Sequence, residues 1–273
     1  MIVEGKVVAV IGVGEGLGQE VARVALRDGA RVVAGARNEE KLKSLCAELD
    51  PSGERIVACP CDMVDQSQCD GLMEVAREKF GGLDAVVIVA AMDTLFGSLE
   101  TTPDEDWMGA MQTNVVGTLH AVKAAVPLLR EGGGGSVVLV GSRSQWFPPG
   151  NPQIAYASSK GALLSSMYHM VNEFGPDKIR VNMVVPTWMW GPPVQMFVKW
   201  QASERGIAEE EVVREITDGM PLGDEIPADD DVAEAIVFFC SDRARMITGE
   251  TLQVNSGEFF REVAQLSLFQ NRR

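Results

Sequence analysis

Short runs of apolar, mostly β-branched residues alternate along the chain with longer segments in which apolar positions recur every three or four residues. The short runs are typical of β-strands, and the longer segments are typical of amphipathic helices. Their regular alternation predicts an α/β fold built on a parallel sheet. Strands are expected at residues 6–11, 31–36, 55–60, 83–91, 136–141, 179–185 and 251–254.

The run at residues 83–91 is apolar almost without a break, which predicts a central strand buried on both faces. The longest predicted helix spans residues 103–130 and carries the polar Asn114 in its interior. Further helices are expected at residues 39–49, 66–80, 155–174 and 228–241.

Composition favours one large domain over residues 1–273, with a substrate loop at about 187–225 and a tail at 258–273. The formal net charge of −15 argues against a nucleic-acid partner. Five cysteines without paired Cys-x-x-Cys spacing predict reduced thiols and no metal site. No apolar stretch reaches the roughly 18 to 20 residues of a membrane span, and no signal peptide precedes the first strand. We therefore expect a cytoplasmic protein with no membrane partner.

A glycine-rich turn follows the first predicted strand and precedes a helical pattern that runs to Leu26. Strand, turn and helix in this order can bind phosphate, because glycine lets the backbone approach a pyrophosphate and a helix N-terminus offers free N–H groups. The alternative is a tight structural turn without a ligand. The predicted cofactor contacts in this turn are Gly12, Gly14, Gly16, Leu17 and Gly18.

The second and third predicted strands end in residues that suit the adenosine half of a dinucleotide. An acidic residue after the second strand would bind the ribose of NAD, but Arg37 stands there and can pair with the 2′-phosphate of NADP. Glu15, in the glycine turn, would oppose that phosphate if it pointed toward it. Asp62 follows the third strand, where an acceptor can hold the adenine amino group.

Tyr156 and Lys160 are four residues apart in a predicted helix and therefore share one face. A cation near a phenol favours the phenolate and lowers its pKa toward neutrality, which suits proton transfer to or from an oxygen. On its own this spacing is more typical of an ordinary solvated helix face, and only the surrounding features favour chemistry. Ser142 ends the fifth predicted strand, at the edge where open α/β sheets bind ligands.

These features together resemble the short-chain dehydrogenase/reductase family from about residue 5 to residue 257. The resemblance implies a Rossmann-type, doubly wound, seven-stranded parallel sheet flanked by helices, a nicotinamide cofactor and a homotetramer or homodimer. With Arg37 in place, NADP(H) is favoured over NAD(H). The matching positions are Gly12-x-x-x-Gly16-x-Gly18, Asp62, Asn114, Ser142, Tyr156-x-x-x-Lys160, residues 182–186 and Thr248-Gly249.

The resemblance also assigns roles to individual residues. Tyr156 protonates a carbonyl oxygen or accepts a hydroxyl proton, while Lys160 lowers the tyrosine pKa and binds the nicotinamide ribose. Ser142 holds the substrate oxygen, and Asn114 positions a water in the proton path. Additional cofactor contacts are expected at Met63, Ala90, Pro186 and Thr187.

Three positions depart from the family pattern. Ile11 replaces a threonine, and the apolar residues 88–91 replace an Asn-Asn-Ala-Gly sequence, so polar groups that seat the adenosine half are lost. Thr187 replaces a glycine and stiffens the loop expected over the nicotinamide. None of these changes alters the serine, tyrosine or lysine.

Aromatic residues follow the fifth and sixth predicted strands, where loops line the ligand cleft. They predict an apolar pocket for a bulky ketone or secondary alcohol, or equally a lid or subunit contact. The first hypothesis is an NADP-preferring oxidoreductase; the alternatives are an NAD-dependent alcohol dehydrogenase and a non-catalytic NADP-binding redox sensor. Candidate pocket residues are Arg143, Trp146, Trp188, Trp190 and Met196.

Overall fold

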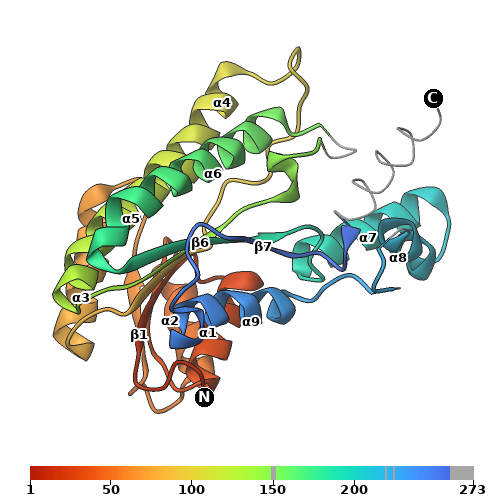
Figure 1. Ribbon diagram of the computed structural model, residues 1–273. Helices are drawn as coiled ribbons and strands as arrows, with labels where there is room; N and C mark the ends of the chain where they lie inside the picture. Colours follow the sequence, from red (N-terminus) through yellow and green to blue (C-terminus); the bar gives the residue numbers. More distant parts are fainter. Residues whose placement is uncertain (149–151, 219, 224, 259–273) are drawn as a thin grey trace.

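The computed structural model describes residues 1–148, 152–218, 220–223 and 225–258. Seven parallel strands form a twisted central sheet in the order β3-β2-β1-β4-β5-β6-β7 (Figure 1). This confirms the predicted doubly wound α/β fold. The strands are β1 Val7–Ile11, β2 Arg31–Ala36, β3 Ile56–Pro60, β4 Ala85–Ile88, β5 Gly135–Val140, β6 Ile179–Pro186 and β7 Thr251–Val254.

Helices cover both faces of this sheet because alternate residues of each strand point to opposite faces. In β1, Val7, Ala9 and Ile11 enter one apolar core, and Val8 and Val10 enter the other. The first core is closed by α3 (Gln66–Phe80), α5 (Thr118–Glu131) and α6 (Ile154–Phe174), and the second by α1 (Leu17–Arg27), α2 (Glu39–Leu49) and α9 (Asp229–Cys240) (Figure 1).

The fourth strand is shorter than the apolar run at residues 83–91 predicted. β4 ends at Ile88, after which the backbone N–H groups of Val89 and Ala90 both donate to the carbonyl of Ile11, at 2.8 and 3.0 Å. This turn takes the chain out of the ladder and places Ala90 against Gly12.

The helix expected at residues 103–130 is interrupted. It consists of α4 (Asp104–Ala110), a π-helical stretch (Met111–Gly117) and α5. Such wider turns are frequent at functional sites, and this one contains Asn114, whose residue surface is only 1% exposed.

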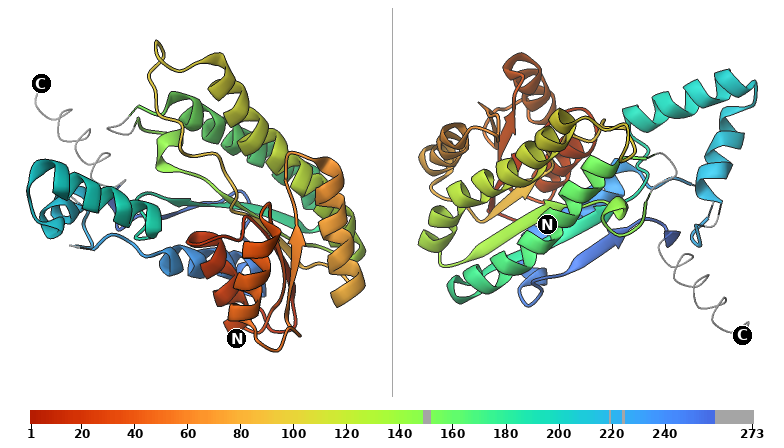
Figure 2. Two further views of the ribbon diagram at one scale, coloured as in Figure 1. Left: turned by 180° about the vertical axis from the view of Figure 1, so that it is seen from behind. Right: turned by 90° about the horizontal axis from the view of Figure 1, so that it is seen from above.

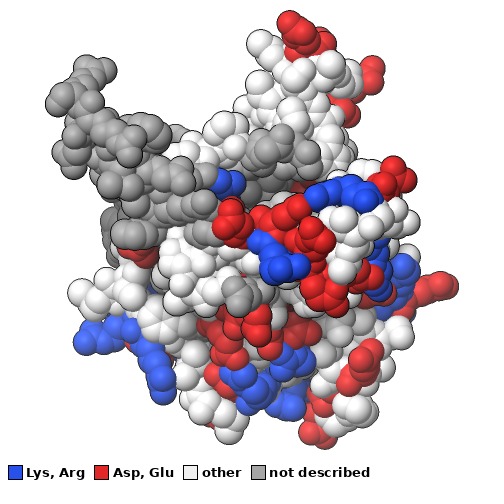
Figure 3. All heavy atoms as spheres, turned by 90° about the vertical axis from the view of Figure 1, so that its right-hand side faces the viewer, with Lys and Arg blue, Asp and Glu red and all other residues white. Residues whose placement is uncertain are grey.

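Two helices, α7 (Pro192–Arg205) and α8 (Glu209–Thr217), project beyond the end of β6 (Figure 2). The segment expected to be a substrate loop therefore contains helical structure. The two helices pack through Val198, Ala202 and Val212. On their outer face, carboxylates and basic side chains are interleaved (Figure 3), as in the pair of Arg205 with Glu215 at 2.6 Å.

The described residues were expected to include neither a membrane-spanning helix nor a metal site. Within residues 1–148, 152–218, 220–223 and 225–258, every helix is too short or too polar to cross a bilayer. In the same ranges, His, Cys, Asp and Glu side chains form no group of three that could hold a metal ion.

Candidate active site

The carboxyl ends of the central strands meet at one edge of the sheet and bring most of the predicted site residues to it. Gly12 follows β1, Ala90 follows the end of β4, Ser142 follows β5, and Pro186 is the last residue of β6. Ligands of open α/β sheets bind at this edge.

The glycine turn has the shape of a phosphate cradle. Gly12 has φ +104°, and a Cβ at this position would lie 2.7 Å from the Cα of Ala90. A Cβ on Gly18 would lie 2.9 Å from the carbonyl carbon of Gly12, so α1 can approach β1 only with glycine there. Around Gly14 a Cβ would meet nothing within 4 Å. Since α1 begins directly after Gly16, its N-terminal N–H groups face this open turn, and the residues fit a dinucleotide pyrophosphate.

Asp229, a residue that sequence reasoning missed, lies beside this turn. Its carboxylate Oδ2 is 3.3 Å from the position of a Cβ on Gly16. Burial raises the pKa of Asp229, and the neighbouring carboxylates of Glu20 and Asp230 raise it further. Both effects disfavour the charged form of this carboxylate, which lies next to a turn suited to phosphate.

The predicted adenosine contacts lie at the ends of β2 and β3. Arg37 is exposed directly after β2, next to Asn38, which caps α2 by accepting a hydrogen bond from the Lys41 N–H at 3.0 Å. The Asp62 carboxylate accepts a hydrogen bond from the Val64 N–H at 3.1 Å, which fixes the turn after β3. Met63, the next predicted contact, is buried at 4% exposure, and Glu15 is exposed in the glycine turn.

Ser142, Tyr156 and Lys160 meet where β5 and α6 face each other. The Ser142 hydroxyl lies close enough to the Tyr156 phenol to lower its pKa. Lys160 is 3% exposed, its ammonium donates to the carbonyl of Val140 at 2.7 Å, and it lies 5.7 Å from the centre of the Tyr156 ring. The structure thus brings together the three side chains that the sequence predicts for binding the substrate oxygen and moving its proton.

The expected electrostatic effect of the lysine on the tyrosine does not dominate. Burial raises the pKa of Tyr156 to about 12, although the nearby Ser142 hydroxyl opposes the rise. Burial also lowers the pKa of Lys160 to about 8. The expectation of a lowered tyrosine pKa is therefore corrected: desolvation of the phenol is the larger effect, and Lys160 directs its ammonium at the Val140 carbonyl.

Local structure holds the Ser142 hydroxyl in place. Ser142 caps a short 3₁₀ turn, Arg143–Gln145, and its hydroxyl oxygen accepts a hydrogen bond from the Ser144 hydroxyl at 2.9 Å. The Gln145 side chain accepts from the Ser142 N–H at 3.3 Å.

Asn114 serves as a clamp between the π-helical stretch, the loop after β4 and α6. Its carboxamide accepts from the Met92 N–H at 2.7 Å and donates to the Met92 carbonyl at 3.0 Å and to the Ser159 hydroxyl at 2.9 Å. The Asn114 carbonyl accepts from the Thr118 hydroxyl at 2.9 Å. A water-positioning role for Asn114 stays a prediction.

Asp93 is a further residue that the sequence did not reveal. The clamp on Met92 and a 3.3 Å hydrogen bond from the Gln153 amide to the Asp93 carbonyl hold its backbone near the catalytic candidates. Its negative charge raises the pKa values of both Tyr156 and Lys160.

Replacing Asp93 by asparagine removes this charge and should lower both pKa values. Carbonyl reduction requires the positively charged form of Lys160. In Asp93→Asn the rate of reduction should therefore begin to fall at a lower pH than in the unmodified protein. Asp93 is exposed, so the difference should shrink at high salt. Profiles of reduction rate against pH at two ionic strengths measure this shift. Glu100→Gln, which removes a charge in the same loop, is the control. If the decline at high pH is the same in Asp93→Asn as in the unmodified protein, the charge of Asp93 does not influence Lys160.

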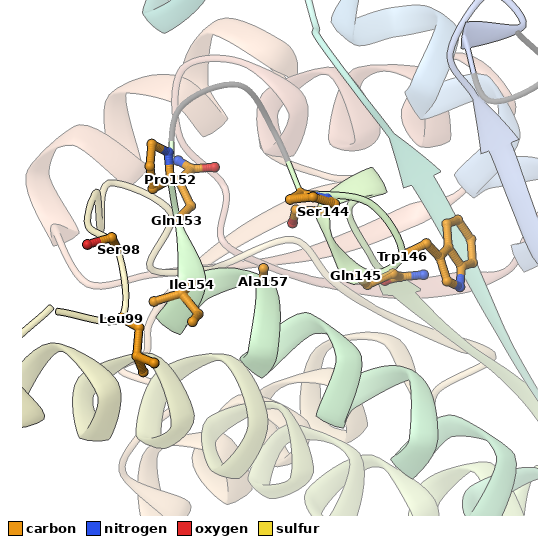
Figure 4. Close-up of a pocket in the computed structure, with 10 residues that line it drawn as sticks. Ser98, Leu99, Ser144, Gln145, Trp146, Pro152, Gln153, Ile154 and Ala157 are labelled. Carbon is orange, nitrogen blue, oxygen red and sulfur yellow. The ribbon is translucent and has the colours of Figure 1, made fainter. Parts of the chain in front are cut away.

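A cavity of about 360 Å³ is lined by residues that lie close in the chain to Ser142 and Tyr156, although neither of these two lines it. Figure 4 shows Leu99 and Ile154 on one side and Gln145 and Trp146 on the other. Ala157, which follows Tyr156 in α6, also lines it.

The other candidate pocket residues lie elsewhere. Trp188 packs on Phe197 of α7 with ring centres 5.4 Å apart, Trp190 is 37% exposed, and Met196 is 70% exposed. Arg143 forms an ion pair with Glu258, and the Thr187 hydroxyl donates to the same Glu258 carboxylate.

A glycine-rich dinucleotide turn beside a serine, tyrosine and lysine group defines a nicotinamide-dependent oxidoreductase of the α/β class. A family model described as "Enoyl-(Acyl carrier protein) reductase" matches residues 12–258. Mouse "Dehydrogenase/reductase SDR family member 4" is 32% identical over 254 residues, which cover 92% of this chain and 86% of that protein. "L-rhamnose 1-dehydrogenase (NAD(P)(+))" of Azotobacter vinelandii is 31% identical over 263 residues, covering 95% and 98%.

Solved structures show the same fold. A putative short-chain dehydrogenase/reductase from Burkholderia xenovorans has a TM-score of 0.84 and 25% identity, with 95% of this chain and 98% of that chain covered. L-Sorbose reductase from Gluconobacter frateurii, complexed with NADPH and L-sorbose, has a TM-score of 0.87 and 24% identity, covering 94% and 98%. The chain belongs to the short-chain dehydrogenase/reductase family and is an NAD(P)-dependent oxidoreductase.

Proposed function

We propose that the protein transfers hydride between NADP(H) and a bulky, largely apolar ketone or secondary alcohol. The observation that carries this proposal is the meeting of Ser142, Tyr156 and Lys160 at the sheet edge that also bears the glycine turn. The bound nicotinamide supplies or accepts the hydride. The chain's own groups bind the substrate oxygen and move its proton.

Tyr156 donates its phenolic proton to the carbonyl oxygen in the reductive direction. With a pKa of about 12 the phenol is protonated at neutral pH and carries the proton to be donated, but it is a weak acid and needs a nearby positive charge to assist the transfer. The Ser142 hydroxyl binds the same oxygen, and the positive charge of Lys160 stabilises the tyrosinate that forms. Reduction should therefore weaken as the pH rises through about 8, where Lys160 loses its proton.

The cavity lined by Ile154 and Ala157, which lie close to Tyr156 in the chain, supports the proposed substrate class. Leu99, Trp146 and Ile154 offer apolar surface to the body of a ketone, while Ser144 and Gln145 lie next to the serine. A panel of aromatic, cyclic and aliphatic ketones, with L-rhamnose added for the relative named after it, tests this assignment by absorbance of the reduced cofactor. No turnover of any ketone would contradict it.

Arg37 supports the preference for NADP(H), because an exposed guanidinium after β2 can pair with the 2′-phosphate. Replacing Arg37 by aspartate is expected to lower the ratio of kcat/KM for NADPH to that for NADH about 100-fold, corresponding to roughly 2.7 kcal/mol. The control is Lys41→Asp, the same charge change at an exposed position of α2. If NADH is already preferred before mutation, the protein is an NAD-dependent dehydrogenase instead.

We also propose that the protein forms a homo-oligomer through α4 and α6. Exposed apolar side chains on these helices support such packing, since Met108 is 67% exposed and Tyr168 is 50% exposed. Light scattering of the purified chain measures the assembly directly.

A further inference from the structure

Glu258 joins three segments that follow neighbouring strands at the substrate edge. Arg143 follows β5, Thr187 follows β6, and Glu258 lies four residues after the end of β7. The Glu258 Oε2 is 3.7 Å from the Arg143 Nε and accepts a hydrogen bond from the Thr187 hydroxyl. One carboxylate oxygen therefore contacts a side chain from each of the two loops that flank the proposed reaction centre.

Water is largely excluded from this contact. The Arg143 and Glu258 side chains are only 19% and 18% exposed, which reduces the screening of their charges. Arg143 directly follows Ser142, which places its backbone beside the serine proposed to bind the substrate oxygen. Glu258 forms an ion pair with its guanidinium.

A substrate carboxylate at this place would meet two unfavourable effects. It would compete with Glu258 for Arg143, and it would leave a second, partly buried carboxylate without its full compensation. Asp93, whose charge acts on both Tyr156 and Lys160, adds negative potential at the same centre. An uncharged substrate avoids both costs.

We propose that Glu258 is a specificity-determining residue that excludes carboxylate-bearing substrates by holding Arg143, so that the site selects carbonyl compounds uncharged near the reacting group. The inference rests on the proposed function for its substrate chemistry. Glu258 acts through Arg143 and has no part in proton transfer.

The replacement Glu258→Gln separates charge from geometry, because glutamine keeps an oxygen that can accept from Thr187 while it removes the negative charge at Arg143. The substrates are benzoylformate and its methyl ester, which share the ketone and the ring and differ in the charge next to the reacting carbonyl. The unmodified protein should prefer the ester. Glu258→Gln should raise kcat/KM for the acid about tenfold, mainly through KM, and change the value for the ester less than about twofold.

Two control variants isolate the role of the charge. Glu250→Gln makes the same charge change at an exposed carboxylate just before β7 and should alter neither substrate. Adding Arg143→Gln to Glu258→Gln should abolish the gain for the acid. An equal effect of Glu258→Gln on the acid and the ester would reduce Glu258 to a structural residue and overturn the proposal.

Calorimetric titration with benzoate gives a readout that is independent of turnover. Its dissociation constant should fall about tenfold in Glu258→Gln and return to the original value when Arg143→Gln is added. An unchanged constant overturns the inference about Glu258. Absence of ketone turnover alongside the expected benzoate result would instead contradict the proposed function alone.

Discussion

Replacing Tyr156 by phenylalanine is expected to lower kcat for carbonyl reduction about 1,000-fold. The substitution removes the proton that must reach the substrate oxygen, and general acid catalysis of this kind contributes roughly 10²- to 10⁴-fold. Phenylalanine keeps the aromatic ring at this position of α6, so cofactor affinity should change little. Consumption of NADPH followed by absorbance, together with a fluorescence titration of NADPH, measures both quantities.

The chain provides a matched control for this replacement. Tyr168 is its other tyrosine, lies on the same helix and is 50% exposed, so Tyr168→Phe should retain full activity. Equal activity of Tyr156→Phe and the unmodified protein would rule out Tyr156 as the acid. Cofactor binding by every variant, with no turnover by any of them, would favour the redox sensor.

Replacing Lys160 by methionine should lower kcat about 100-fold or more and at the same time stabilise the fold. Burial lowers the pKa of this lysine from 10.5 to about 8, so the charged form is disfavoured in the folded protein. At about 1.4 kcal/mol per pKa unit, the cost near neutrality is on the order of 3 kcal/mol. Loss of the hydrogen bond to the Val140 carbonyl offsets about 1 kcal/mol, which leaves a gain of about 2 kcal/mol.

The lowered pKa of Lys160 makes the stability of the unmodified protein depend on pH. Between pH 8 and pH 10.5 the unfolded lysine binds more protons than the folded one, so the unmodified protein gains stability as the pH rises through this range. The advantage of Lys160→Met should therefore be largest below pH 8 and decline above it. Urea unfolding at pH 7 and pH 10 measures the difference; Lys199→Met on α7 is the control. A destabilised Lys160→Met at pH 7 would contradict the buried-charge interpretation.

The sheet could be predicted because each strand carries its own local signal. Val7, Val8, Val10 and Ile11 fill both cores of the sheet, and a short β-branched run of this kind favours a strand that is buried on both faces. The π-helical stretch around Asn114 could not be predicted in the same way. It depends on the pairing of Asn114 with Met92 and Ser159, which lie 22 and 45 residues away in the chain.

The candidate site was predictable only where chemistry follows a local motif. The tyrosine and lysine are four residues apart, and the glycines lie in one turn, so their spacing is visible in the sequence. Asp93, Asp229 and Glu258 reach the site from separate segments with no common spacing. The direction of the Tyr156 pKa shift was also inaccessible, because it depends on how far the fold desolvates the phenol.

The Asn114 clamp has a consequence for motion. Because one carboxamide bonds both the N–H and the carbonyl of Met92, the loop after β4 cannot leave the π-helical stretch without breaking both of these hydrogen bonds together. The loop and the π-helical stretch therefore form one cooperative unit of local unfolding, and the bond to Ser159 ties this unit to α6. The backbone amide of Met92 should consequently exchange its hydrogen as slowly as its helical neighbours do, although it lies in a connecting segment.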